Sequence, residues 1–447
     1  RKPFHSQVAP TYCSNKVKGY FTRYMASSTV GAQPSFSTLA ISTNEPVVSV
    51  DWLHANIRDP DLKVLDASWY MPDEQRNPLQ EYQVACIPGA LFFDIDGITD
   101  RTTNMLQLAI RHAFEIDFIT FYDRKALLIY QLPHMLPAEE AFAAAVSALG
   151  IENKDGVVVY DGKGIFSAAR VWWMFRTFGH DKVWVLDGGL PRWRASGYDV
   201  ESTAPGDAIL KSSAATEAIE KVYQGQMVGP TTFQTKFQPH LVWTLDQVKR
   251  NIQDKAYQHI DARSKARFDG VAPEPRKGIN SGHVPGSKCI PFPQSLVTPN
   301  AALENWQLET AEDSQFPEPK EMATHEGDNY EDAKTIIEGA GNAIKGWAWE
   351  NMDQLNEVLH KYYQIMDPLK MLDGSQTLLS REELEKKFGQ EGISLDKPIV
   401  ASCGTGVTAC ILVLGLHRLG KTDIPVYDGS WTEWATQPDT PLSTSER

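Results

Sequence analysis

The chain has 447 residues, 42% of them hydrophobic, and its formal net charge at pH 7 is −14. That length can hold two ordinary domains, and no run approaches the roughly 20 consecutive apolar residues that a membrane helix needs. The acidic balance argues against nucleic-acid binding, which normally requires a basic patch or stripe. We therefore expect a protein that has neither nucleic acid nor a membrane among its partners.

The first 44 residues differ in composition from the rest of the chain. Residues 1–43 contain no Asp or Glu, are rich in Ser and Thr, and carry five Lys or Arg residues. This composition is typical of an organellar transit peptide, and an ordinary disordered tail is the alternative. We expect residues 1–44 to be disordered and to direct the protein to the mitochondrion. Because the chain begins with Arg, we expect its natural start to lie upstream, and Met25 would begin a shorter, cytoplasmic form.

From residue 45 onward the sequence contains two copies of one pattern. Each copy has an apolar strand that ends in Asp-Ala, an Ile/Val-Pro-Gly turn that leads into another strand, and a Gly-x-Gly loop between a strand and an apolar helix. The matched segments are 63–67 and 259–262, 87–93 and 284–290, and 157–188 and 399–429. Alternating strands and helices, with continuously apolar strands, predict parallel sheets covered on both faces. The predicted fold class is therefore α/β, with two tandem domains that each contain a mainly parallel sheet flanked by helices.

The pattern also suggests where the domains begin and end. We place the first domain at 45–201, a Pro- and Gly-containing linker at 202–240, and the second domain at 241–441. Two segments have no counterpart in the other copy: the apolar segment 105–131, and the segment 295–370, which has 15 acidic and 5 basic residues. Because the flanking sequence continues the pattern on both sides, we interpret the two insertions as retained introns or gene-model errors rather than evolved modules.

The five cysteines form no recognisable disulfide or zinc pattern, because their number is odd and no paired Cys-x-x-Cys spacing occurs. We expect a reducing compartment, no metal, no cofactor, and one reactive thiol. At matched positions of the two Gly-x-Gly loops, the copies carry Asp161 and Cys403. A carboxylate cannot replace a thiolate as a sulfur nucleophile. We therefore expect the first domain to be non-catalytic and Cys403 to be the nucleophile of the second.

The loop after Cys403 is suited to holding a thiolate. Its small residues permit a tight turn whose backbone N–H groups converge on the sulfur, and the helix that follows presents its positive N-terminal end. The residues expected to build this cradle are Gly404, Gly406, Val407 and Thr408. Thr405 adds a hydroxyl beside the sulfur. Cysteine phosphatases share this strand–Cys–loop–helix arrangement but need an Arg six residues after the Cys, where this chain has Ala409.

These features resemble the tandem-rhodanese-domain sulfurtransferases, in particular the thiosulfate/3-mercaptopyruvate type of plants, over nearly all of 45–441 outside the two insertions. The loop 403–408 is similar to the mercaptopyruvate-type loop, Cys-Gly-Ser/Thr-Gly-Val-Thr, whereas the thiosulfate-type loop carries basic residues after the Cys. The resemblance implies that Cys403 takes sulfur from 3-mercaptopyruvate, with thiosulfate as a weaker donor. It implies that a Cys403 persulfide forms, that pyruvate is released, and that the acceptor is cyanide, a small thiol or a thioredoxin-like protein.

The same resemblance implies two further parts of the site. Arg267 and Arg276 match the arginines that grip the carboxylate and ketone oxygens of a 2-oxo acid, for which a guanidinium fork is well suited. The mercaptopyruvate-type members are thought to move protons with a Ser or Thr, a His and an Asp. Thr405 fills the first of these positions, but we expect the His just before Ile-Pro-Gly of the first domain, where this chain has Cys86. His283 has that place only in the second domain, so we expect the interface to lack its proton carrier.

Two other functions remain open from the sequence. A thiosulfate-preferring rhodanese would use the same nucleophile. A non-catalytic sulfur-carrier or redox-binding protein would instead use Cys403 and Cys410 as a thiol pair, although a residue about two helical turns further along is more easily explained as part of the core.

Overall fold

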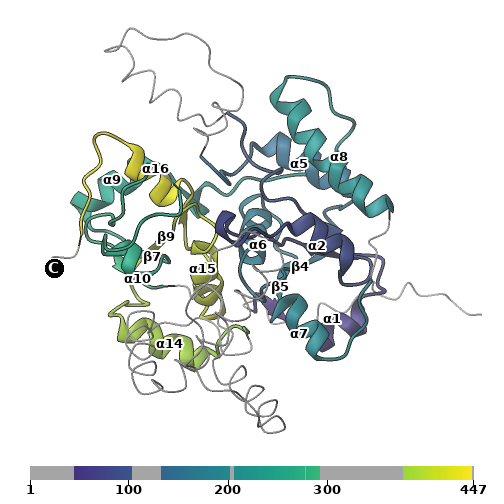
Figure 1. Cartoon of the computed structure of the whole chain (residues 1–447), viewed down its shortest axis with the longest axis horizontal. Coiled ribbons are helices and arrows are strands. Elements are labelled where there is room, and N and C mark those ends of the chain that lie inside the picture. Colours follow the sequence, from purple (N-terminus) through teal and green to yellow (C-terminus); the bar gives the residue numbers. More distant parts are fainter. Residues whose placement is uncertain (1–44, 103–131, 202–205, 277, 292–375, 445–447) are drawn as a thin grey trace, which may run out of the picture. The chain divides into compact units, whose positions relative to one another are not determined.

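The computed structural model describes residues 45–102, 132–201, 206–276, 278–291 and 376–444 (Figure 1). The predictions made for 1–44 and for the insertions 105–131 and 295–370 lie outside these described residues. Within the described part, no helix is both long and apolar enough to cross a membrane.

The first copy of the pattern forms a five-stranded sheet in which every neighbouring pair is parallel. Its strands are β1 (Val47–Val48), β2 (Leu62–Asp66), β3 (Leu91–Phe92), β4 (Gly156–Tyr160) and β5 (Val183–Leu186), in the order β1-β5-β4-β2-β3. Every residue of the central strand β4 is buried, which explains why its sequence is apolar throughout rather than alternating.

The second copy forms a sheet with the same architecture. Its strands are β6 (Val242–Trp243), β7 (Gln258–Asp261), β8 (Lys288–Cys289), β9 (Ile399–Ser402) and β10 (Val426–Tyr427), in the order β6-β10-β9-β7-β8. All of its pairs are parallel as well. The register is also repeated, because Asp66 pairs with Tyr160 in the first sheet and Asp261 pairs with Ser402 in the second. The predicted α/β fold class with two parallel sheets is confirmed.

Helices cover both sheets. Those of the first half are α1 (Val50–Asn56), α2 (Pro78–Val84), α5 (Glu139–Ala148), α6 (Ala168–Thr177), α7 (Gly189–Ala195) and α8 (Gly206–Tyr223), with a short 3₁₀ turn η2 (Pro72–Glu74). Those of the second half are α9 (Leu245–Asp254), α10 (Lys265–Phe268), α14 (Arg381–Gln390), α15 (Ala409–Arg418) and α16 (Ser430–Thr436), preceded by the 3₁₀ turn η3 (Pro239–Leu241).

Helix α8 lies inside the segment 202–240 that we predicted to be a linker. Its buried residues recur at helical spacing, and they are Ala208, Ser212, Ala215 and Ile219. The Ser212 hydroxyl donates to the Phe92 carbonyl of β3, and α8 packs against α5. Part of the connection is therefore packed onto the first sheet, because small apolar residues on one helix face outweigh the turn-forming composition around them.

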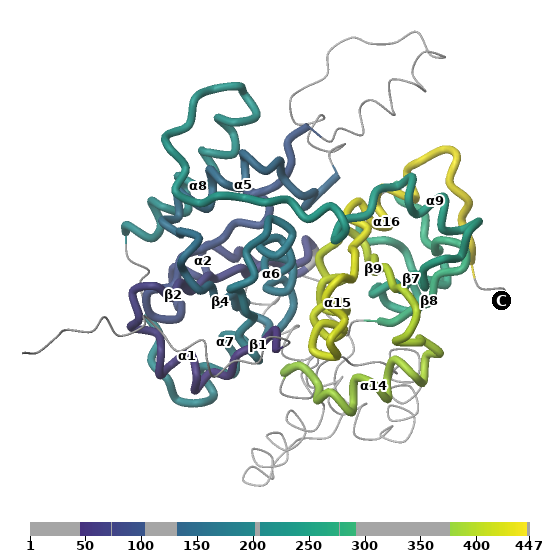
Figure 2. Tube along the Cα trace, turned by 180° about the vertical axis from the view of Figure 1, so that it is seen from behind, coloured from purple at the N-terminus to yellow at the C-terminus, as the bar shows by residue number. Residues whose placement is uncertain are grey.

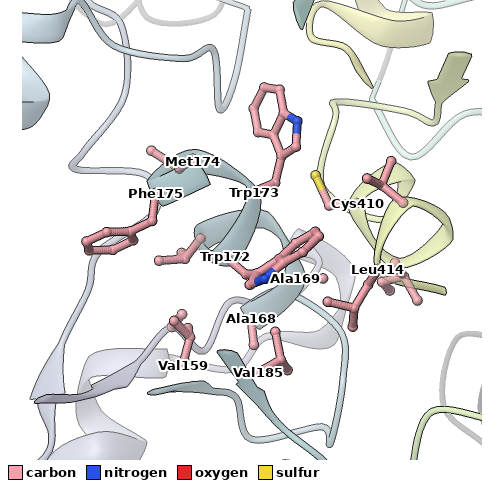
Figure 3. Close-up of a cluster of buried hydrophobic side chains, with 14 of the residues drawn as sticks. Val159, Ala168, Ala169, Trp172, Trp173, Met174, Phe175, Val185, Cys410 and Leu414 are labelled. Atoms are coloured by element: carbon pink, nitrogen blue, oxygen red, sulfur yellow. The ribbon is translucent and has the colours of Figure 1, made fainter. Parts of the chain in front are cut away.

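Helices α6 and α15 pack against each other, and Figure 2 shows them side by side between the two sheets. Nearly every side chain of both helices is buried. In the close-up of Figure 3, Cys410 and Leu414 of α15 face Ala169 and Trp173 of α6. One hydrophobic cluster runs through this contact and includes strand residues from both sheets. The two helices that follow the Gly-x-Gly loops are thus joined in one core, which brings residues of the first half close to the Cys403 loop.

Candidate active site

Cys403 directly follows β9, and its side chain is in a buried position, 2% exposed. The chain after β10 fixes its backbone. The Ser430 hydroxyl accepts a hydrogen bond from Cys403 N (3.1 Å), and Trp431 N donates to Cys403 O (2.9 Å). The carbonyl of Gly404 accepts from the N–H and the hydroxyl of Thr432, at 3.0 and 2.8 Å. In a trans peptide unit the N–H and the C=O point in opposite directions. Because the carbonyls of Cys403 and Gly404 point toward α16, the N–H groups of the residues that follow them point to the opposite side.

Ser430 adopts a backbone conformation that is unfavourable for a residue with a side chain. Its φ is 51°, in the left-handed region, and the equivalent residue of the first half is Gly189, with φ 54°. The Ser430 hydroxyl bridges Cys403 N and the Tyr427 carbonyl, to which it donates at 2.8 Å. The second half therefore tolerates strain at a position that contacts its cysteine.

The equivalent loop of the first half, residues 161–167, which we call the twin loop, shows what this turn can bind. Its Asp161 carboxylate accepts from the N–H groups of Lys163 (2.8 Å), Phe166 (2.7 Å) and Ala168 (2.9 Å). The turn is thus an anion cradle that the first half fills with its own carboxylate. In the Cys403 loop, the N–H groups of residues 404–408 donate to no acceptor among the described residues. They remain available for an anion at the position that Asp161 occupies in the twin loop.

Thr405 contacts a histidine from the first half. His134 Nδ1 lies 3.0 Å from Thr405 Oγ1, and His134 Nε2 lies 2.8 Å from Asp96 Oδ1. Trp69 Nε1 donates to the other Asp96 oxygen at 3.1 Å, and its ring packs edge-on against the imidazole. The histidine is 3% exposed. A hydroxyl, an imidazole and a carboxylate are therefore connected in series beside Cys403.

This chain of contacts corrects our expectation that the interface lacks a histidine. The position at which the resemblance places the histidine is Cys86, which is buried on the other face of the first sheet, where its backbone pairs with Glu201. His283 stacks on Phe268, and its Nδ1 lies 2.9 Å from the Phe268 carbonyl. The imidazole that meets Thr405 comes instead from the segment 132–137, Leu-Pro-His-Met-Leu-Pro.

The surroundings of His134 and Asp96 affect the ionisation of both. Burial lowers the pKa of His134 below its ordinary 6.5, and the hydrogen bond and charge of Asp96 only partly offset this effect. Desolvation alone would raise the pKa of Asp96, but the hydrogen bond and charge of His134, with the hydrogen bond from Trp69, lower it overall. At neutral pH the structure therefore favours a neutral imidazole beside an ionised carboxylate.

The two predicted arginines both lie near the loop, but they differ in their partners. Arg267, in α10, donates from Nε (3.1 Å) and from Nη2 to Glu274, which also accepts from Arg263 Nη1 at 2.8 Å. A Cβ atom on Gly404 would lie 3.1 Å from Arg267 Nη2, so the guanidinium rests against the loop. Arg276 forms no ion pair with any residue in the described ranges. Desolvation and the charge of Arg267 lower the pKa of Arg276, while the charges of Asp96 and Cys403 act in the opposite direction.

Cys410 is completely buried, and its thiol donates to the Gly406 carbonyl at 3.2 Å. Burial raises the pKa of this thiol well above its ordinary value, which keeps it protonated. The thiol that would form the alternative redox pair with Cys403 is thus held in the core as a neutral group.

Comparison with known proteins identifies the family. Residues 49–196 match the rhodanese-like domain. Over 445 residues the chain is 58% identical to thiosulfate/3-mercaptopyruvate sulfurtransferase 1, mitochondrial, of Arabidopsis thaliana, and the match covers 100% of this chain and 90% of that protein. The chain belongs to the thiosulfate/3-mercaptopyruvate sulfurtransferase family. A second Arabidopsis member, sulfurtransferase 2, is 56% identical over 99% of this chain and 98% of its own length.

A solved structure agrees with this assignment. The fold is similar to that of SseA from Escherichia coli, a 3-mercaptopyruvate sulfotransferase, with 27% identity and a TM-score of 0.51. The match covers 87% of this chain and 99% of that one. The predicted family, its rhodanese fold and its transferase class are confirmed. This sulfurtransferase family member also repeats the sheet order of its first half in its second half.

Proposed function

We propose that the protein transfers sulfane sulfur from 3-mercaptopyruvate to a thiol or cyanide acceptor through a persulfide on Cys403, and that thiosulfate is a weaker donor. The observation that carries this proposal is the series Thr405–His134–Asp96 beside Cys403, because only a donor whose leaving group needs a proton requires such a series. The names of the relatives, which include both donors, support it.

Substrate binding is assigned to the two arginines. Arg276, which has no carboxylate partner in the described part of the chain, binds the carboxylate of the 2-oxo acid, and Arg267 binds next to it at Gly404. Guanidinium groups bind carboxylate and ketone oxygens in a fork geometry, and this interaction holds the donor sulfur against Cys403.

In the first step the Cys403 thiolate attacks the thiol sulfur of 3-mercaptopyruvate. An S–S bond forms, the C–S bond breaks, and its electron pair passes to the carbon of the leaving group, which becomes the enolate of pyruvate. The proton of the donor thiol passes through the Thr405 hydroxyl, with His134 and Asp96 holding that hydroxyl and sharing the charge. It then reaches the carbon and gives pyruvate, so the step neither consumes nor releases a proton.

The second step returns the enzyme to its starting state. Cyanide attacks the outer sulfur of the persulfide, the S–S bond breaks, and thiocyanate leaves together with the Cys403 thiolate. A small thiol or a thioredoxin-like protein takes the same sulfur and becomes a persulfide itself. The N–H groups of Gly404, Gly406, Val407 and Thr408 stabilise the persulfide anion between the two steps. The twin loop supports an anion-binding role for this turn in general, because its Lys163, Phe166 and Ala168 N–H groups bind the Asp161 carboxylate, although Lys163 matches Thr405 rather than a glycine.

We further propose that the protein acts in the mitochondrion. The acid-free composition of residues 1–43 supports this location, as does the name of the Arabidopsis relative, which is described as mitochondrial. Fusion of residues 1–44 to a fluorescent protein tests the proposal, because cytoplasmic fluorescence would contradict it.

The function is tested by incubating the protein with 3-mercaptopyruvate and cyanide and measuring pyruvate, in parallel with thiocyanate formation from thiosulfate. Without an acceptor, the intact mass should increase by one sulfur atom. Cys403→Ser should abolish both activities and the added mass, whereas the matched control Cys410→Ser should retain them. Retention of the adduct in Cys403→Ser with loss in Cys410→Ser would refute the assignment. Faster turnover with thiosulfate would favour a thiosulfate-preferring rhodanese.

A further inference from the structure

Arg170 is a buried cation that connects the first half of the chain to the Cys403 loop. It is 0% exposed, and its Nη2 lies 2.7 Å from Asp428 Oδ1. The same guanidinium donates to the carbonyl of Gly406 (3.3 Å) and to the carbonyl of His134. Burial alone would lower the pKa of Arg170, but the charges of Asp428 and of nearby thiols raise it overall, so the side chain stays charged. One side chain therefore holds both the loop and the backbone of the histidine that faces it.

The backbone at His134 requires such support. Its φ is 61°, in the left-handed region that side chains other than glycine seldom adopt. Conformations of this kind persist only where the surrounding contacts determine them. Two residues later, Leu136 N donates to the second oxygen of Asp428 at 2.7 Å. The Arg170–Asp428 pair thus contacts the strained corner at two backbone groups.

The other half of the chain shows which of these contacts the fold itself requires. Its equivalent corner has Gln376, also with φ 61°, and Leu378 N donates to Asp187 at 2.7 Å. The Asp–amide contact is thus common to both halves. The arginine is not, because the third residue of α6 is Arg170 and the third residue of α15 is Ile411. In the second half Arg418 donates to the carbonyls of Leu378 and Leu379, but among the described residues no arginine donates to the carbonyl of Gln376 itself. The fold thus forms the left-handed corner without the contact that Arg170 makes to the His134 carbonyl, so Arg170 has a role beyond forming that corner.

We propose that Arg170 is a positioning residue that fixes the His134 imidazole against Thr405 by binding the carbonyls of His134 and Gly406. The proposal rests on the function proposed above. It follows that Arg170 matters most for the donor whose leaving group takes up a proton. Attack on thiosulfate breaks an S–S bond and releases sulfite, which needs no proton at carbon, so this donor depends on the loop alone.

The chain provides a matched control on the same helix. Arg176, also in α6 and nearly buried, reaches the second half by donating to the Thr422 carbonyl at 3.2 Å, and it lies over the Trp172 ring. Among the described residues it forms no hydrogen bond or ion pair with the Cys403 loop or with the corner at His134. If buried arginines between the halves contributed only to structure, substitutions at Arg170 and at Arg176 would have the same effect on turnover.

The experiment measures kcat/KM with 3-mercaptopyruvate and with thiosulfate for wild type, Arg170→Gln, Arg170→Lys, His134→Ala, the Arg170→Gln/His134→Ala double variant, and Arg176→Met. Arg170→Gln should lower the mercaptopyruvate value about 10²-fold, the low end for losing a positioned proton-transfer group, and the thiosulfate value less than about 10-fold. Arg170→Lys should lie between Arg170→Gln and wild type. Arg176→Met should change both donors by the same factor.

The double variant separates positioning from general disruption. In the His134→Ala background, the further replacement of Arg170 should lower mercaptopyruvate turnover by a factor no larger than the factor by which it lowers thiosulfate turnover. The reason is that the effects of residues that act as a unit are not additive. The proposal would be overturned if Arg170→Gln lowered kcat/KM equally with both donors. It would also be overturned if the decrease in kcat/KM for mercaptopyruvate in the double variant equalled the product of the decreases in the two single variants. If Arg170→Gln does not fold, Arg170→Lys and Asp428→Asn provide the same comparison. A wild-type protein that releases no pyruvate would instead refute the proposed function.

Discussion

The unequal partners of the two substrate arginines lead to unequal consequences for their removal. Arg276 has no ion pair among the described residues, whereas Arg267 shares the Glu274 carboxylate with Arg263. Arg276→Ala therefore removes a group that is engaged only when the donor is bound. Arg267→Ala also deprives Glu274 of one of its two cationic partners, at a side chain that is 4% exposed.

The sizes of the two effects follow from these contacts. A charge-assisted hydrogen bond contributes about 1.5–3 kcal/mol, and because a factor of ten corresponds to about 1.4 kcal/mol, each substitution should lower kcat/KM for mercaptopyruvate about 10- to 150-fold. Arg276→Ala should leave the free energy of unfolding unchanged. Arg267→Ala should lower it by about 1–3 kcal/mol, since a buried carboxylate loses a donor, although the bond from Arg263 limits the cost.

Pyruvate release measured over a range of donor concentrations, with thermal unfolding of the same preparations, tests both statements. Glu274→Gln is the control, because it weakens the hold on Arg267 without removing either guanidinium. The reasoning is refuted if Arg276→Ala keeps kcat/KM for mercaptopyruvate within about twofold of wild type, less than the loss of even a neutral hydrogen bond. It is also refuted if Arg276→Ala and Arg267→Ala have the same melting temperature.

Four further predictions concern the loop and the proton relay. Ser430→Gly relieves a left-handed strain of about 1–3 kcal/mol while losing the hydrogen bond to Cys403, so Ser430→Ala, which loses the bond and keeps the strain, should have the lower melting temperature in thermal unfolding. Gly404→Arg places a second cation against Arg267 and should raise the ratio of thiosulfate to mercaptopyruvate turnover; an unchanged ratio would contradict the electrostatic explanation. Because the pKa of His134 lies below 6.5, mercaptopyruvate turnover should persist as the pH falls through 6.5 and decline only when the imidazole becomes protonated. Asp96→Asn removes the partner that raises this pKa, so the acid limb of the pH–rate profile should move to still lower pH.

The two parallel sheets were predictable because they depend on local pattern, whereas Cys403 as nucleophile and Arg267 and Arg276 as substrate-binding residues stay predictions, the arginines resting on the family resemblance. Continuous apolar strands and a repeated Gly-x-Gly loop define the parallel sheets, and the comparison of Asp161 with Cys403 shows which loop can act on sulfur. The linker prediction missed helix α8, because one apolar face of small residues is a weak signal within Gly- and Pro-containing sequence.

The histidine was missed for a different reason. His134 and Thr405 are 271 residues apart in the chain and meet only where α6 packs on α15, a contact that periodicity does not predict. The internal repeat does not reveal it either, since the equivalent corner of the second half carries Gln376. The usable signal was His134 itself, a polar ring in the otherwise apolar segment 132–137. That segment ends just before helix α5.

The first half carries Asp161 at the position matched to Cys403, and it supplies the imidazole, the carboxylate and the buried arginine that lie beside the Cys403 loop of the second half. A duplicated domain that has become inactive is ordinarily dispensable, and selection then has no reason to retain it. On the function proposed above, deletion of the first half would remove the groups assigned to proton transfer, and the second-half residue that meets the twin loop, at Gly164, is Gln376 rather than a histidine. The proposed function therefore makes the two halves mutually dependent, because the thiol comes from one half and its proton relay from the other.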